Sequence, residues 1–238
     1  MNYINKSQYM KRILIGFSGK IGSGKNFIAE EIFLPKLFNI YSKRTPDKKL
    51  IPYYFSFGDH LKIECLCRNS YTNLDQTTAM YNFFIEKDQT TRDMLQKYGT
   101  ENGRHVYHED IWVRAVESWI SIQESRLSKL RDRTNNDFLP IFIISDVRFK
   151  NEAEFIKSNN GILIRVNAPN RSNKRISSEA NGDNLIMEKI KSHLSEISLD
   201  NYEFEYNISN DDNTLEILNS NSEEIIKNFL RRKYLLKS

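Results

Sequence analysis

The chain has 238 residues, a length that is typical of one α/β domain rather than of two independent domains. Hydrophobic residues make up 39% and charged residues 28%, which supplies a sizeable core and argues against wholesale disorder. Lys and Arg total 35 against 31 Asp and Glu, and the resulting net charge of +4 is too small for a nucleic-acid binder but suits a small anionic ligand.

The cysteine content and the hydropathy indicate where the protein works. Cys65 and Cys67 form a C-x-C pair with no other cysteine in the chain, so neither a disulfide framework nor a four-ligand zinc site can form. No apolar run approaches the roughly 20 residues that span a bilayer. Met1 to Arg12 are too polar for a secretory signal. We therefore expect a cytoplasmic protein without membrane or nucleic-acid partners; its oligomeric state stays open, with a homodimer as one option.

Short apolar runs alternate with segments of helical spacing along the chain. The former are typical of buried parallel strands and the latter of helices packed on a sheet. Residues 71–87 show no clear period and predict neither element. We expect, in chain order, the strand Ile13–Phe17, a helix from Lys25 to about Leu34 that ends before Pro35, the strand Ile51–Phe57, helices at Asp59–Cys67, Thr90–Tyr98 and Ile111 to about Leu130, the strand Ile141–Asp146, the helix Asn151–Ser158, strands at Ile162–Val166 and Phe204–Ser209, and a helix from Thr214 to about Phe229.

The alternation of elements predicts a three-layer α/β fold with a mainly parallel, five-stranded sheet. Ligands of such sheets bind beyond the carboxyl ends of the strands, where Gly19 and Asp146 would lie. The polar stretch at about 169–200 is rich in Arg, Lys and Ser and is long enough to be a mobile lid with a helix inside it. We treat residues 1–238 as a single domain.

A phosphate-binding loop, or P-loop, follows the first predicted strand. Residues 19–26 read GKIGSGKN and match the pattern G-x-x-x-x-G-K. Its glycines let backbone N–H groups curl round phosphate oxygens at a helix N-terminus, and Lys25 would hold the β- and γ-phosphates. Coincidence is the alternative, but the position between a strand and a helix argues against it. The predicted ATP contacts in this loop are Gly19, Lys20, Gly22, Ser23, Gly24, Lys25 and Asn26.

A magnesium ion is expected with ATP, although the usual hydroxyl ligand is missing. Asn26 stands where a P-loop normally has Ser or Thr, so an amide oxygen would replace the hydroxyl, or the ion would be held through water and other carboxylates. Asp146 ends an apolar strand, and its carboxylate can orient magnesium and its waters. Arg148, two residues on, can neutralise phosphate oxygens. The alternative for this pair is a surface salt bridge with a helix cap.

Arg92 and Gln96 are four residues apart and would share one helix face. This face could bind the phosphate and the base of an acceptor. On spacing alone, a solvated helix that ends at Gly99 explains the pattern equally well.

Four motifs occur in order: the P-loop, R-x-x-L-Q-x-x-G-T-E-x-G-R from Arg92, D-V-R-F-x-N-E from Asp146, and H-x-S-E before Leu-Asp from His193. Together they resemble the deoxynucleoside monophosphate kinases of phages and large DNA viruses, over most of the chain from about Ile13 to Phe229. The resemblance implies a P-loop fold of the nucleoside-monophosphate-kinase type, with ATP on the P-loop and a deoxynucleoside monophosphate as acceptor. It also implies an acceptor-binding helical region at about 59–130 and, for a viral protein, the host cytoplasm.

The resemblance also assigns roles residue by residue. The catalytic residues that it implies are Lys25, Arg92, Asp146 and Arg148. Asp59 and Lys62 match an Asp-Pro-Leu-Lys turn in which His60 replaces Pro. The implied acceptor-binding residues are Asp59, Lys62, Arg92 and Gln96, and the implied lid contacts to ATP are Arg171 and Arg175. Trp112 is a further candidate, as a wall of the acceptor pocket, although two tryptophans seven residues apart on one helix face, Trp112 and Trp119, are more often core.

Two other functions fit parts of the pattern. Animal phosphomevalonate kinases resemble the same superfamily and share the P-loop and the D-x-R pair, which is Asp146 and Arg148 here. A protein of that kind would have a phosphorylated alcohol as its acceptor. A base-binding Gln96 argues mildly against that substrate. A non-catalytic module that binds ATP is the other alternative, and Asn26 is the residue that favours it.

Overall fold

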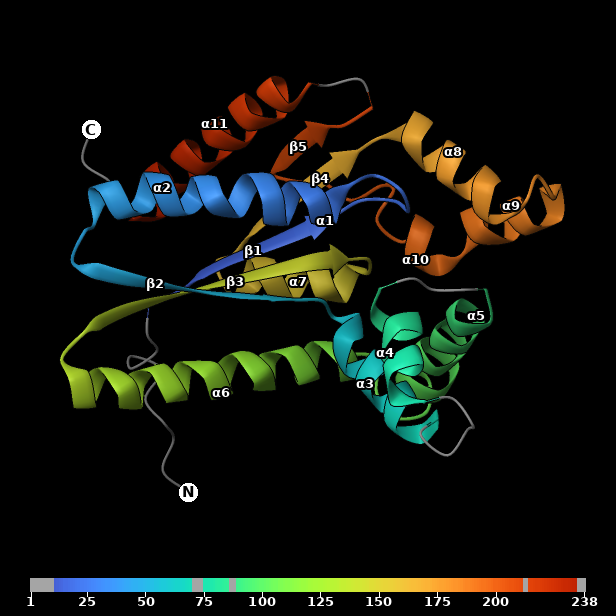
Figure 1. Cartoon of the computed structure of the whole chain (residues 1–238), viewed down its shortest axis with the longest axis horizontal. Coiled ribbons are helices and arrows are strands. Elements are labelled where there is room, and N and C mark those ends of the chain that lie inside the picture. Colours follow the sequence, from blue (N-terminus) through green and yellow to red (C-terminus); the bar gives the residue numbers. More distant parts are fainter. Residues whose placement is uncertain (1–10, 70–74, 86–88, 212–213, 235–238) are drawn as a thin grey trace. The chain divides into compact units, whose positions relative to one another are not determined.

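The computed structural model describes residues 11–69, 75–85, 89–211 and 214–234 (Figure 1). Two compact units make up the chain. The first unit contains the residues up to Phe55 and those from Ile122 onward, and the second unit is Ser56–Ser121.

The first unit is built on a five-stranded sheet with the order β2-β3-β1-β4-β5. Each neighbouring pair of strands runs parallel, which confirms the predicted fold class. Almost every residue of β3 is buried, as expected of a central strand that is covered on both faces. The strands are β1 (Ile13–Ser18), β2 (Lys48–Phe55), β3 (Asp137–Val147), β4 (Ile162–Asn167) and β5 (Tyr206–Ser209).

Helices cover both faces of this sheet. In Figure 1, α2 and α11 lie over one face, and α7 and the later part of α6 lie over the other. The helices of the first unit are α1 (Lys25–Phe27), η2 (Ile28–Phe33), α2 (Leu34–Arg44), the end of α6 (Ile111–Thr134), α7 (Lys150–Ser158), α8 (Pro169–Glu179), α9 (Asn184–Ser192), α10 (Leu194–Ile197) and α11 (Leu215–Tyr234).

Alternate residues of β1 serve the two faces. Ile13, Ile15 and Phe17 belong to the large core cluster that also holds Leu37 of α2 and Phe229 of α11. The three strand residues point the same way because side chains alternate along a strand. The sheet is therefore the middle layer of three, with apolar contacts on both sides.

The expected end of the first helix at Leu34 is wrong, because the helix continues past Pro35 to Arg44. A wide π-helical turn, η2, precedes the proline, and the Leu34 N–H bonds to the Ala29 carbonyl five residues earlier. Pro35 then lies in the first turn of α2, where no backbone N–H is needed. The wide turn therefore removes the conflict that a proline causes inside a regular α-helix.

The second unit is helical. It consists of α3 (Gly58–Asn69), α4 (Gln76–Phe84), α5 (Gln89–Lys97), η3 (Tyr98–Arg104) and the first part of α6. η3 is a second π-helical turn that continues α5, and the buried residues Gly99 and Gly103 lie in it. Part of 71–87, for which the sequence predicts no element, thus forms the helix α4.

The predicted lid, 169–200, holds three helices, α8, α9 and α10, rather than one. Gly182 and Asn181, which both have positive φ, form the turn between α8 and α9. Asp183 then caps α9 by accepting hydrogen bonds from the backbone of Leu185 and Ile186. Within the described ranges, no helix combines the length and the apolar character that crossing a bilayer requires.

Gly16 gives a first testable prediction about the packing of β1. A Cβ atom at Gly16 would lie 2.3 Å from Cδ1 of Ile156 and 2.9 Å from Cδ2 of Leu163, both in the core. We expect Gly16→Ala to lower the free energy of unfolding by about 1–3 kcal/mol, because overpacking forces side chains out of their rotamers. Denaturation in urea measures the loss.

Gly58→Ala is the matched control for Gly16→Ala. A Cβ atom at Gly58 would lie 3.7 Å from Ser56 Oγ, an ordinary contact, so we expect a change within about 0.5 kcal/mol. Equal unfolding midpoints for Gly16→Ala and the wild type would show that the core around β1 accommodates the extra methyl group.

Candidate functional site

The P-loop joins β1 to the first helix of the first unit. Gly22 and Gly24 have φ of 75° and 81°, a region that glycine enters without strain. The Ser23 N–H bonds to the Lys20 carbonyl at 3.1 Å and closes the turn. Gly24 then serves as the N-cap of α1. The glycines therefore stand where the predicted phosphate cradle needs them.

Register between strands brings the D-x-R pair to this loop. Ser18, the last residue of β1, pairs with Val147 of the neighbouring strand β3. The parallel pairing therefore places Asp146 and Arg148 beside the start of the P-loop. The Lys25 ammonium lies 3.2 Å from Asp146 Oδ1, and Arg148 Nε donates to the same oxygen at 2.8 Å.

Burial and charge act against each other on these two cations. Burial lowers the pKa of Lys25, and the Asp146 carboxylate opposes that shift. Burial also acts to lower the pKa of Arg148, but Asp146 and Glu196 outweigh it and raise this pKa. A phosphate that approached Lys25 would favour its charged form further, because an opposite charge stabilises the ammonium.

Glu152 holds the turn that carries Arg148. Its Oε2 accepts from the backbone N–H of Arg148 at 2.7 Å and from that of Phe149 at 3.1 Å. The Glu152 side chain is buried and caps the N-terminus of α7. The D-V-R-F-x-N-E motif is thus one structural piece, in which its final glutamate fixes the backbone of its arginine.

Glu196, which lies far along the chain, joins the charge cluster formed by Lys25, Asp146 and Arg148. Its Oε1 accepts from Arg148 Nη1, and its Oε2 accepts from the Ile21 N–H of the P-loop at 2.9 Å. The Glu196 side chain has a relative exposure of 8%. The sequence motif H-x-S-E contains this residue, but sequence reasoning gave it no role.

His193 positions Glu196 by capping the short helix α10. Its Nδ1 accepts from the Ser195 N–H at 3.2 Å. Burial and then the nearby charge of Arg148 lower the pKa of His193, while Glu196 opposes the shift. A neutral imidazole is the form that can accept a hydrogen bond. The capped turn directs Glu196 toward the P-loop.

Asp200 makes a second link from the segment His193–Asp200 to the start of the P-loop. Its Oδ2 accepts from Lys20 Nζ at 2.9 Å, and its Oδ1 lies 3.5 Å from Arg165 Nη2. Arg165 also donates to Ser18 Oγ at 2.9 Å. Lys20, a predicted ATP contact, is therefore paired with a carboxylate, but both of these side chains remain largely exposed.

The two predicted lid arginines lie beside the P-loop glycines. A Cβ atom at Gly22 would lie 2.7 Å from Arg175 Cβ and 3.2 Å from the Arg171 carbonyl oxygen. Asp211 caps α8 by accepting from the Arg171 N–H at 3.0 Å. Both arginine side chains are exposed. The structure thus places Arg171 and Arg175 beside the loop, and their contact with ATP stays a prediction.

Asn210 supports the P-loop from below, which sequence reasoning missed. Its side-chain amide donates to the Ser23 carbonyl at 2.8 Å, and a Cβ atom at Gly24 would lie only 2.4 Å from that nitrogen. Asn210 is buried and directly follows β5. The Ser23 hydroxyl is also buried and has no hydrogen-bond partner among the described residues. A ligand oxygen would satisfy that hydroxyl.

The residues near the P-loop fit a magnesium ion that arrives with ATP. Magnesium in such sites takes one or two carboxylates together with phosphate oxygens and waters. Asp146 offers a carboxylate, and Asn26, exposed in the first turn of α1, offers an amide oxygen. In the part of the chain that the structure describes, no three His, Cys, Asp or Glu residues gather to hold a metal by themselves.

Within the second unit, Asp59 and Lys62 form a pair. Lys62 Nζ donates to Asp59 Oδ1 at 2.7 Å, and the other carboxylate oxygen accepts from the Ser56 N–H at 2.7 Å. His60 occupies the first turn of α3, and its ring makes an edge contact with Trp119. The turn therefore forms with His in place of Pro.

The other predicted acceptor residues also belong to the second unit. Arg92 and Gln96 are half-buried on α5, one turn apart. Trp112 is buried, and its indole N–H donates to the Gly99 carbonyl at 2.9 Å. A Cβ atom at Gly103 would lie 2.6 Å from its ring. Trp112 thus supports the turn η3, and its part in acceptor binding stays a prediction.

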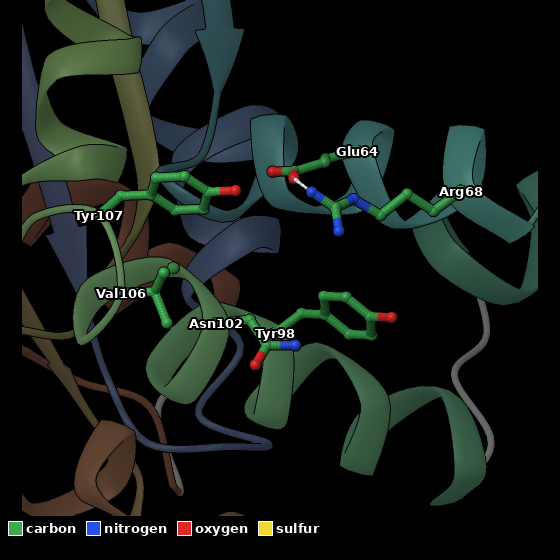
Figure 2. Close-up of a pocket in the computed structure, with 7 residues that line it drawn as sticks. Glu64, Arg68, Tyr98, Asn102, Val106 and Tyr107 are labelled. Carbon is green, nitrogen blue, oxygen red and sulfur yellow. Dashed lines mark hydrogen bonds and ion pairs between the residues drawn. The ribbon is translucent and has the colours of Figure 1, made fainter.

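A cavity of about 210 Å³ opens between α3 and η3 in the second unit (Figure 2). Figure 2 shows Glu64 and Arg68 of α3 facing Tyr98 and Asn102. The Arg68 guanidinium lies 5.7 Å from the centre of the Tyr98 ring. None of the predicted acceptor residues lines this cavity. Its lining residues are Glu64, Arg68, Tyr98, Asn102, Gly103, Val106 and Tyr107.

Two viral kinases are similar in sequence to this chain, and no family model matches it. The chain is 34% identical over 82 residues to the deoxynucleoside-5'-monophosphate kinase of Escherichia phage T5, which covers 34% of this chain and only 26% of the phage protein. It is 29% identical over 164 residues to the "Putative deoxynucleotide monophosphate kinase" of Acanthamoeba polyphaga mimivirus, which covers 66% of this chain and 75% of the relative. These relatives confirm the resemblance that the four motifs indicated.

Several solved kinases have a distantly similar fold. Shikimate kinase from Acinetobacter baumannii aligns with 93% of this chain and 95% of its own, at 13% identity and a TM-score of 0.39. Dephospho-CoA kinase from Campylobacter jejuni aligns with 92% of this chain and 97% of its own, at 15% identity and a TM-score of 0.41. Similarity at these scores is low, and the fold assignment rests on the parallel sheet and its P-loop.

Asn210 gives a prediction about the support of the P-loop. We expect Asn210→Ala to weaken ATP binding about 5-fold to 150-fold, because the Ser23 carbonyl loses its buried donor, at a cost of about 1–3 kcal/mol. Titration calorimetry with ATP measures the change. Asn207→Ala is the matched control, since Asn207 is exposed on the adjoining strand β5. Equal affinities for wild type and Asn210→Ala would rule out this support.

Proposed function

We propose that this protein is a deoxynucleoside monophosphate kinase, which transfers the γ-phosphoryl group of ATP to the 5′-phosphate of a deoxynucleoside monophosphate. The products are ADP and a deoxynucleoside diphosphate. The observation that carries the proposal is the contact of Asp146 with both Lys25 and Arg148 beside a P-loop. The names of the two viral relatives support the choice of acceptor.

The proposed phosphoryl transfer requires positioning and charge neutralisation, and it does not require a general base. The second pKa of a phosphate monoester is near 6, so the attacking oxygen is already ionised at neutral pH. Lys25 and the P-loop amides would hold the transferred group in line with the acceptor. Arg148 would neutralise its oxygens as charge shifts in the transition state. Arg92 would contribute a further positive charge, as the resemblance implies.

Magnesium would be held by Asp146 and Asn26, through water for at least part of the shell. When bound with ATP, the ion supplies positive charge that neutralises the phosphate oxygens. The protein supplies the carboxylate that orients it. Asp146 is also shared with Lys25 and Arg148, and so couples the ion site to both cations.

A lid is needed because water competes with the acceptor for the phosphoryl group. The exposed cations Arg171 and Arg175 of α8 stand beside the P-loop glycines, where they would contact ATP phosphates. Closure of a lid excludes water from the reacting groups. The acceptor itself would bind at Asp59, Lys62, Arg92, Gln96 and Trp112.

The proposal predicts that deoxynucleoside monophosphates stimulate ADP release. Mg-ATP is incubated with a panel of deoxynucleoside and ribonucleoside monophosphates, with phosphomevalonate and without any acceptor. We expect slow hydrolysis alone and a marked increase with one or a few deoxynucleotides. Stimulation by phosphomevalonate would instead show that the acceptor is a phosphorylated alcohol.

ATP hydrolysis that no acceptor changes would contradict a kinase. It would favour the non-catalytic binding module instead, which the exposed Asn26, without a hydroxyl for magnesium, also favours. ATP binding that barely depends on magnesium would add to that alternative.

Asp146→Asn tests the centre of the proposed site. The substitution keeps an acceptor oxygen but removes the negative charge shared by Lys25 and Arg148. We expect turnover to fall on the order of 10²-fold, while the affinity for ATP changes only a few-fold. Steady-state kinetics and ATP titration separate the two effects.

Asp137→Asn is the matched control at the opposite end of the same strand, where Asp137 pairs with Lys48 at 3.1 Å and is exposed. Its turnover should equal that of the wild type. A fully active Asp146→Asn enzyme would remove this carboxylate from the mechanism.

A further inference from the structure

Arg148 reaches the site with its guanidinium held from two sides. Its Nε donates to Asp146 at 2.8 Å and its Nη1 donates to Glu196. Among the described residues, Nη2 makes no such contact. A guanidinium has five N–H donors in a rigid plane, so two anchored nitrogens fix the direction of the third. Nη2 is thus the nitrogen left for a phosphate oxygen.

Glu196 is the anchor that also touches the P-loop. Its second oxygen accepts from the Ile21 N–H at 2.9 Å, so one carboxylate joins the loop to Arg148. Both partners are donors, and a carboxylate has two acceptor oxygens to meet them. A glutamine has only one acceptor oxygen and would turn N–H groups toward one of the two partners.

Contacts of its neighbours fix the position of Glu196. His193 caps α10 by accepting from the Ser195 N–H, and the next residue is Glu196. The neighbouring Leu199 is buried, with 3% of its surface exposed. Asp200 binds Lys20 beyond it. The segment from His193 to Asp200 is therefore attached to two consecutive residues of the P-loop, Lys20 and Ile21.

We propose that Glu196 is a positioning residue of the kinase, which aligns the Arg148 guanidinium with the P-loop and thereby with the phosphoryl group in transfer. This inference rests on the proposed function. Glu196 acts through Arg148, whose guanidinium it joins to the loop backbone, and it touches no reacting atom. Its removal should therefore slow the transfer step while ATP binding persists, because Lys25 and the loop glycines remain in place.

Two substitutions separate positioning from packing. Glu196→Gln keeps the size of the side chain but loses one acceptor oxygen and the charge. Glu196→Asp keeps both oxygens and the charge on a shorter arm. Positioning predicts that Glu196→Gln is the more damaging change, with kcat about 10-fold to 100-fold lower and the Kd for ATP within about threefold. A role in packing alone predicts the opposite order, and that order would overturn the proposal.

A double-mutant cycle tests whether Glu196 acts through Arg148. In an Arg148→Ala background, Glu196→Gln should change kcat less than about threefold, because the group to be aligned is gone. Glu188→Gln is the matched control, because it makes the same change of side chain on the neighbouring helix α9, where Glu188 is exposed. Its kcat should stay within about threefold of the wild type, since exposed substitutions of this kind change little.

The same assays distinguish this inference from the proposed function. Wild-type enzyme without acceptor-stimulated ADP release would overturn both. Wild-type transfer together with a Glu196→Gln kcat equal to that of the wild type would overturn only the inference. Additive losses in the cycle would do the same, since they would place Glu196 and Arg148 in independent roles. ADP titration of every variant verifies that its P-loop is folded.

Discussion

Buried charges require partners, and this constraint organises the carboxyl edge of the sheet. Lys25 and Arg148 are largely buried and share Asp146, and Arg148 also meets Glu196. The effective penalty of burying an unpaired ion is several kcal/mol, so each of these cations depends on its carboxylates. One cluster of paired charges thus connects the P-loop, the end of β3 and the short helix α10. Glu196 of α10 belongs to this cluster although it lies 175 residues after its P-loop partner Ile21.

Local sequence patterns were enough to predict the strands and the loop that carry this charge cluster. The apolar runs at Ile13–Phe17 and Ile141–Asp146 became β1 and β3, because a strand buried on both faces needs an uninterrupted apolar run. Parallel pairing then brought the P-loop and the D-x-R pair together, as the general rule for such sheets predicts. The glycine pattern and the position of Asp146 could thus be interpreted from the sequence without knowledge of distant contacts.

The remaining parts depend on contacts that no local pattern contains. Asn210 bonds to Ser23 across 187 residues, and a single asparagine after a strand carries no signal for that role. Glu196 stood in a recognisable motif, yet only its two oxygen contacts show what it holds. Pro35 was misleading for another reason, since its local rule assumes a regular α-helix and the wide turn η2 breaks that assumption.

The wide turn also restricts how the length of this helical segment can vary during evolution. Leu37 and Tyr41 follow η2 in α2, and both are buried in the core. Each residue rotates an α-helix by about 100°, so losing one residue between Lys25 and Leu37 would turn this apolar face away from the sheet. Related sequences should therefore exchange residues in this stretch freely on its exposed side, but should keep its length unless α2 is rebuilt as well.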